Sequence, residues 1–447
     1  MGRILCLMQM VNLYRKHRIE SIKSREPHLR LFNHDKMGKY LLTFFGLIFY
    51  FLGHGQGRTL EYFIQQATQN SPLLKGFQNQ LLLNQLDSQI LKASTRTQVN
   101  FISNDSYAPV INGWGYDEAI TNGANVSALV QATKNFLNRG NLAAQYRAIT
   151  LQNRAMLDTI RLSVKDLYRT ITEQYLTAYG DLLTMDFNRE VYDLLKREDT
   201  VFKKLTQANV YRQTDYLAFF VTFQQQQLNF MQAQIQYNVD YTTLSYLAGI
   251  VDTTIERVQE PIVADSTQID FYSSAFYQRY VTDSLRIANE RLLINYSYKP
   301  RIGAFTDAGY NSSMMITPYK NFGFSVGLNL TIPIYDGKQK RLKYQKLDIE
   351  EQTRLANKNF FINQYNQQVG LLKQQLYATN DLMDKIRQQI VYVRTLITAN
   401  GKLLETGDVK ITDYITAINN YLNVKNLFNQ NYINRLKITN QINYWNR

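Results

Sequence analysis

The sequence is poor in cysteine, histidine and proline, and each shortage restricts what the protein can be. Its 447 residues include one Cys, four His and seven Pro. A single Cys cannot form an internal disulfide framework or a cysteine-rich zinc site. Sparse Pro favours long uninterrupted elements over a fold rich in loops. An apolar fraction of 45% with 19% charged residues is ordinary for a folded chain and excludes wholesale disorder.

Residues 1–55 contain the only Cys and all four His. Within them, residues 40–52 form an apolar run, YLLTFFGLIFYFL, which follows Lys39 and is followed by small residues. A basic flank, an apolar run of this length and small residues before a cleavage point are typical of a secretory signal peptide. We therefore expect an unused upstream segment plus a signal peptide, cleaved before Gln56. An uncleaved N-terminal anchor is the alternative, although the run is shorter than the about 20 residues of a transmembrane helix.

Removal of this segment changes the chemistry available to the chain. The net charge of +14 includes nine basic and three acidic residues of the segment, so +8 remains on a long polar surface and nucleic-acid binding is not expected. The remaining residues include no His and no Cys, which excludes imidazole acid–base chemistry and a thiol nucleophile. No phosphate-binding, dinucleotide-binding or serine-hydrolase motif is found either. We expect no enzyme, no catalytic residue, no cofactor and no metal site.

The rest of the chain shows an internal two-fold repeat, with a first unit at 57–249, a linker at 250–267 and a second unit at 268–447. A shift of 198 residues aligns Asn209 with Gly407, two residue types that suit a left-handed helix-to-helix turn. Each unit has the order helix, strand, strand, long helix, turn, helix, and the long helices would reach about 100 Å. The patterns predict helices at 59–93 (with a break at Ser71-Pro72), 141–208, 214–247, 271–295, 338–406 and 412–444, and extended stretches within 99–130, 300–310 and 322–334.

The stretch 322–334 alternates between apolar and small or polar residues. Such alternation over 9–11 residues is typical of a strand in a transmembrane barrel, and equally of a half-buried strand in a soluble sheet. Four strands cannot close a barrel, and open sheet edges do not survive in lipid, so several chains would have to contribute. Three copies would give twelve strands, which is within the known range for barrels. The residues expected to face lipid are Phe322, Phe324, Val326, Leu328, Leu330 and Ile332.

Two motifs add to this order of elements. Residues 330–337 read LTIPIYDG, and residues 406–408 (TGD) are followed by TDYI at 412–415. Together with the signal peptide and the repeat, they make residues 57–447 resemble the TolC family of outer-membrane efflux proteins. The resemblance implies a membrane protein of mixed α and β structure. It would be a homotrimer with a 12-stranded outer-membrane β-barrel, four strands per chain, continued by a long α-helical coiled-coil barrel in the periplasm.

The resemblance also implies a function. The protein would be the outer-membrane channel of a tripartite efflux or type I export system, a passive exit duct for small molecules or proteins. Its partners would be a periplasmic adaptor (membrane fusion) protein, an inner-membrane pump of RND, ABC or MFS type, and the outer-membrane lipid of a Gram-negative-type bacterium. A periplasmic coiled-coil adaptor or scaffold is the alternative. Two helix pairs that each follow a strand pair favour the channel.

The resemblance assigns roles to residues at both helix-to-helix turns. Gly407 matches the glycine of the tip motif that adaptors contact, and Asn209 occupies the corresponding place in the first unit. Asp413 matches an aspartate that rings the closed aperture, and Thr416 falls on the second ring position. An acidic residue in the first turn of a helix is also favoured by the helix dipole alone, which is a second explanation for Asp413.

A gate latch is implied as well. Asp215 matches an aspartate that is tied to an arginine in the closed state, and the dipole argument applies to it too. The arginine position is Val409 in this sequence, and we expect Lys410 to take its place. Asn, Gln, Ser and Thr dominate the expected lumen, which indicates no particular cargo.

Overall fold

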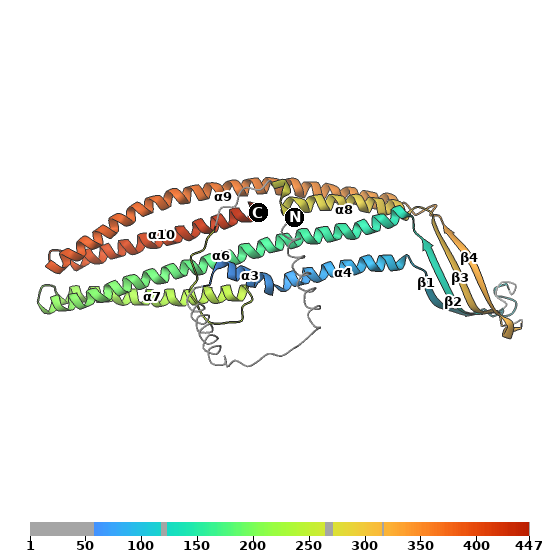
Figure 1. Ribbon diagram of the computed structural model, residues 1–447, viewed down its shortest axis with the longest axis horizontal. Coiled ribbons are helices and arrows are strands. Elements are labelled where there is room, and N and C mark those ends of the chain that lie inside the picture. The colour runs from blue at the N-terminus through green and yellow to red at the C-terminus, as the bar shows by residue number, and fades with distance from the viewer. Residues whose placement is uncertain (1–57, 118–122, 264–270, 315–316, 447) are drawn as a thin grey trace, which may run out of the picture. The chain divides into compact units, whose positions relative to one another are not determined.

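The computed structural model describes residues 58–117, 123–263, 271–314 and 317–446 (Figure 1). The predicted signal peptide and its cleavage point lie outside these residues. The elements are, in order, α3 Leu60–Asn70, α4 Pro72–Ser94, β1 Gln98–Tyr107, β2 Ala124–Phe136, α6 Arg139–Gln207, α7 Gln213–Leu247, the 3-10 turn η1 Phe271–Ser273, α8 Ala275–Ser297, β3 Arg301–Ser312, the 3-10 turn η2 Pro318–Lys320, β4 Phe322–Thr331, α9 Gln339–Thr406 and α10 Ile411–Asn446.

The helices lie where the scarcity of proline and the capping residues predicted them. The break between α3 and α4 is confirmed: the Ser71 side chain accepts the backbone N–H of Leu74 at 3.3 Å, and Pro72 is the first helical residue. The long helices α6 and α9 have 69 and 68 residues, which corresponds to about 100 Å each. Figure 1 shows α7 beside α6 and α10 beside α9, and each of these pairs is in contact.

Strand β4 is shorter than the expected stretch 322–334. It ends at Thr331, because Pro333 has no backbone N–H to donate and the partner strand β3 begins only at Arg301. Ile332 therefore lies just beyond the strand, where it is 53% exposed.

Two apolar clusters hold the helices together. The first joins α3, α6, α7 and α10, and at its centre the ring of Phe63 meets the rings of Tyr175 and Tyr241 edge-on. The hydroxyl of Tyr175 donates to the carbonyls of Arg58 and Gln259, so the start of the described chain is fixed to the segment that follows α7. The second cluster lies where α6, α7, α9 and α10 turn, and includes the fully buried Phe202 and Phe219.

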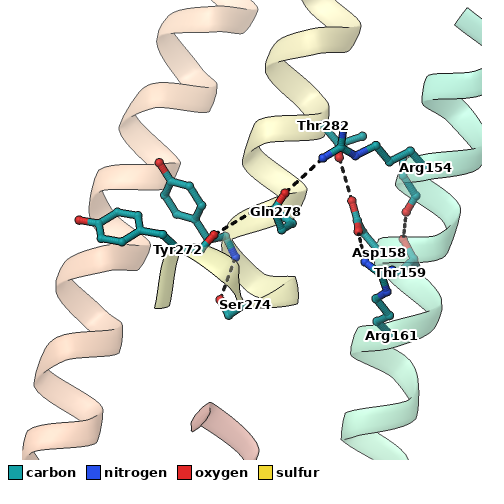
Figure 2. A network of polar contacts seen from close by, with 10 residues as sticks. Arg154, Asp158, Thr159, Arg161, Tyr272, Ser274, Gln278 and Thr282 are labelled. Carbon is teal, nitrogen blue, oxygen red and sulfur yellow. Dashed lines mark hydrogen bonds and ion pairs between the residues drawn. The ribbon is translucent and has the colours of Figure 1, made fainter. Parts of the chain in front are cut away.

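A buried polar network connects α6 with α8 (Figure 2). The carboxylate of Asp158, 2% exposed, accepts the hydroxyl of Thr282 at 2.8 Å and pairs with Arg161 of its own helix. One turn earlier on α6, Arg154 donates to the side-chain carbonyl of Gln278 on α8. Because a buried polar group costs free energy unless it is paired, these partners fix how the two helices meet.

The four strands form one antiparallel sheet in the order β1-β2-β3-β4. The β2–β3 pairing joins the two halves of the chain, from Val126 opposite Ser312 to Phe136 opposite Ile302. In the described sheet β1 and β4 are the outer strands, and each has a neighbour on one side only.

Candidate functional site

One face of the sheet is mainly apolar, and apolar residues of all four strands contribute to it. The register places Leu328 of β4 opposite Ala304 of β3, and Val130 of β2 opposite Phe101 of β1. The side chains of β4 on this face are largely exposed, with Phe324 at 83% and Leu328 at 80%. This face is made by Val99, Phe101, Ser103, Asp105, Tyr107, Ala124, Val126, Ala128, Val130, Ala132, Lys134, Phe136, Ile302, Ala304, Thr306, Ala308, Tyr310, Ser312, Phe322, Phe324, Val326, Leu328 and Leu330.

The opposite face is mainly polar or small, with Ile102, Leu129 and Phe305 as its large apolar members. An apolar face of this extent is unusual on a monomeric soluble protein. A sheet that is apolar on one side and polar on the other has the side-chain arrangement of a membrane barrel wall. The polar and small members of this face are Gln98, Asn100, Asn104, Ser106, Asn125, Ser127, Gln131, Thr133, Asn135, Arg301, Gly303, Asp307, Gly309, Asn311, Gly323, Ser325, Gly327, Asn329 and Thr331.

The turns that end the long helices have the same geometry. Asn209 (φ 59°) and Gly407 (φ 82°) both take the left-handed conformation, as their residue types predicted. In the first turn the N–H of Val210 reaches the carbonyl of Leu205, and in the second the N–H of Asp408 reaches that of Leu403. These bonds, with a second one from Asn209 and from Gly407, form a Schellman motif at each turn.

Tyr211 connects the two turns. Its single hydroxyl proton is shared between the carbonyl of Leu404 at 2.9 Å and that of Val409 at 3.1 Å, while its ring packs on Phe202. Sequence reasoning did not single out this residue. The only available signal was an aromatic side chain placed two residues after the left-handed Asn209.

The predicted aperture residues lie at the start of α10. Asp413 and Thr416 are exposed, and their spacing places them on one side of the helix, whereas Tyr414 between them is buried. The Thr416 hydroxyl donates to the carbonyl of Thr412. The pair therefore presents one carboxylate and one hydroxyl to the outside of the chain.

The predicted latch residues lie in the same region. Asp215 is half-buried in the first turn of α7, and Lys410 is exposed just before α10. They form no ion pair with each other within the described chain. The contact observed between the two turns is the one made by Tyr211.

Comparison with known proteins gives the fold its context. No protein-family model and no curated protein matches the sequence. The structure is similar to that of CusC, a protein studied for its folding and transmembrane channel formation, with a TM-score of 0.69 and 11% identity over 86% of this chain and 91% of that one. It is also similar to the outer membrane protein VceC from Vibrio cholerae, with a TM-score of 0.67 and 12% identity over 87% of this chain and 96% of that one. The Campylobacter jejuni outer membrane channel CmeC has the same TM-score and identity, over 87% of this chain and 85% of that one. The chain has the fold of these channel proteins.

Within this channel fold, a carboxylate pair lies between α6 and α7. Burial and, after it, the neighbouring Asp240 raise the pKa of Asp181 to about 7. Partial burial opposes a lowered pKa of Asp240, but hydrogen bonds outweigh it: first the one with Asp181, then those from Gln236 at 2.6 Å and Gln174 at 3.0 Å. Lys437 of α10 counteracts the shift of Asp181. No sequence motif indicated this pair.

None of the helices in the described ranges combines the length and apolar character needed to span a membrane. Among those residues no group of three or more His, Cys, Asp or Glu side chains is placed to hold a metal ion.

Proposed function

We propose that three copies of the chain close their sheets into a 12-stranded β-barrel in the outer membrane of a Gram-negative-type bacterium. The observation that carries this proposal is the two-sided sheet with two outer strands. The β1 strand of one copy would pair with the β4 strand of the next. No strand edge would then be left open, and every backbone N–H and C=O group in the hydrocarbon region would have a partner. The 10 residues of β4 extend for about 33 Å, and with a tilt of about 40° they cover about 25 Å, the height of a barrel's apolar band.

The long helices would continue this barrel as a duct through the periplasm. Each chain supplies two helix pairs, α6 with α7 and α9 with α10, and each pair follows a pair of strands. This arrangement supports a repeat with units at 57–249 and 268–447. The protein would act as the passive outer-membrane channel of a tripartite efflux or export system, in which an adaptor contacts the turns at Asn209 and Gly407 and an inner-membrane pump drives transport.

The aperture of the duct would be formed by the starts of the α10 helices. Three copies of Asp413 around one axis would concentrate negative charge, with Thr416 as the neighbouring ring, and would favour cations. Asp215 and Lys410 would act between neighbouring copies, since no ion pair joins them within the described part of one chain.

Planar-bilayer recording of the purified protein tests this function. We expect trimers that conduct, and an Asp413→Asn variant with a weaker preference for K⁺ over Cl⁻. The matched control is Asp87→Asn, which removes the same charge from an exposed position on α4, a helix that does not reach the turns. Equal selectivity of the two variants would show that Asp413 is not at the aperture.

Cell fractionation tests the location. We expect the mature chain in the outer-membrane fraction. Recovery in the soluble periplasm, without conductance in any bilayer, would instead favour a coiled-coil adaptor or scaffold.

A further inference from the structure

All four junctions between strands and helices are basic. They lie along one edge of the sheet, because the register brings Gln98 opposite Thr133, Phe136 opposite Ile302 and Arg301 opposite Thr331. We call the cationic residues at this edge the basic collar. Its members are Lys92, Arg96, Lys134, Arg139, Lys299, Arg301, Lys338, Lys340, Arg341 and Lys343.

The charge of the collar is not neutralised within the described chain. None of its ten members belongs to an ion pair there, and all are exposed except Lys340, which is half-buried. The one acidic residue at the four junctions is Asp336. Its carboxylate accepts the backbone N–H groups of Lys338 at 3.0 Å and Lys340 at 2.7 Å, so it serves the start of α9.

The collar adjoins apolar surface. Lys134 lies on the apolar face of the sheet, in register with Ala304. Between the end of β4 and Lys338, Ile334 is 96% exposed and Tyr335 is 82% exposed. Exposed aliphatic and aromatic side chains next to Lys and Arg are typical of the boundary between hydrocarbon and lipid headgroups.

The opposite edge of the sheet has a different charge. The described residues there carry Asp105 and Asp117 and one cation, Lys320. Positive charge is thus concentrated at the edge from which the helices leave. A soluble polyanion would contact the cations but not the apolar residues beside them. A phospholipid would contact both, with its headgroup on the cations and its acyl chains on the apolar residues.

We propose that the basic collar binds anionic phospholipid headgroups of the periplasm-facing leaflet. The proposal rests on the proposed function, since it requires the sheet to lie in the outer membrane. Each Lys or Arg close to an anionic lipid surface strengthens binding about fivefold. Four cations on α9 and just before it therefore give a strong preference for anionic over zwitterionic lipid.

The test compares lipid retention by two variants of the full chain. The collar variant replaces Lys338, Lys340, Arg341 and Lys343 with Gln. The control variant replaces Lys75, Lys203, Lys373 and Lys402, four exposed helical residues outside the junctions, with Gln. Each protein is equilibrated in mixed bilayers with equal amounts of phosphatidylglycerol and phosphatidylcholine, and the retained lipid is identified by native mass spectrometry.

We expect the original chain and the control to retain phosphatidylglycerol in preference to phosphatidylcholine. In the collar variant, the ratio of retained phosphatidylglycerol to phosphatidylcholine should fall at least about tenfold. An unchanged preference, or an equal loss in the control, overturns the proposal while the channel function stands. Tight binding of heparin at 0.15 M salt without discrimination between the two lipids also overturns it. A chain that inserts into no bilayer refutes the channel function and the collar together.

Discussion

Removal of the Tyr211 hydroxyl should loosen the contact between the two helix turns. In a Tyr211→Phe variant the ring still packs on Phe202, but the hydrogen bond shared by the carbonyls of Leu404 and Val409 is lost. The Leu404 carbonyl keeps the N–H of Gly407 at 3.2 Å as a partner. Tyr211 has one hydroxyl proton, which the two carbonyls share, so one hydrogen bond with a net worth of about 0.5–1.5 kcal/mol is lost and the Val409 carbonyl loses this donor. We therefore expect local opening of the turns to become easier by about 1–2 kcal/mol.

Amide hydrogen exchange measures this change directly. An easier opening by 1–2 kcal/mol increases the open population about 5- to 30-fold, and exchange of the amides around residues 407–411 should accelerate by that factor. Amides in the middle of α6 and α9 should exchange at their original rates.

Tyr216→Phe is the matched control. The Tyr216 hydroxyl donates to Asp199 at 3.1 Å, which joins α7 to α6 without reaching the second turn. Unchanged exchange at residues 407–411 in Tyr211→Phe, or an equal acceleration in Tyr216→Phe, would refute the reasoning. If the turns also form the closed aperture, Tyr211→Phe should raise the open probability in bilayer recordings.

Three further predictions concern the sheet, a turn and the carboxylate pair. Leu328→Lys should lower the free energy of unfolding in lipid by about 2–4 kcal/mol, whereas Asn329→Lys on the opposite face should change it by less than about 1 kcal/mol; denaturant titration in lipid vesicles compares them. Gly407→Ala should cost about 1–2 kcal/mol in thermal unfolding, because the φ of 82° disfavours a side chain and the new Cβ would lie 3.3 Å from the Val210 side chain. Asp181→Asn should stabilise the protein by about 1–2 kcal/mol at pH 8 and by little at pH 4. The raised pKa means that the folded protein holds the Asp181 proton more tightly than the unfolded chain does. The contribution of Asp181 to stability therefore falls as the pH rises from about 4 through 7. Unfolding curves at the two pH values that shift equally would contradict this last expectation.

The helices could be predicted from the sequence because their signals are local. No proline occurs between 139 and 247 or between 339 and 446, and Asn209 and Gly407 mark the turns. The apolar side of β4 was equally readable, since alternation in one strand decides which residues share a face. The end of that strand was misjudged because it depends on the partner β3, which begins after Pro300.

The contacts between distant segments could not be predicted in the same way. Tyr211 finds its two acceptors 193 and 198 positions away. The raised pKa of Asp181 arises from burial and from Asp240 on another helix. Both depend on how the helices pack, which no periodicity encodes. The roles of Asp215, Lys410, Asp413 and Thr416 stay predictions, because they concern neighbouring copies.

The β2–β3 pairing has a consequence for the order in which the chain folds. The helix pairs and the β1–β2 and β3–β4 hairpins join neighbouring segments, whereas Phe136 must find Ile302, 166 positions later. Long loops close at a higher entropic cost, so this pairing should form after the hairpins and the helix pairs. Gly309 then fixes the correct alignment, because a Cβ at this position would lie 2.2 Å from the carbonyl oxygen of Ala128. A shift of β3 against β2 by two residues would place a larger side chain at this close approach. The observed register is therefore favoured when the two strands pair.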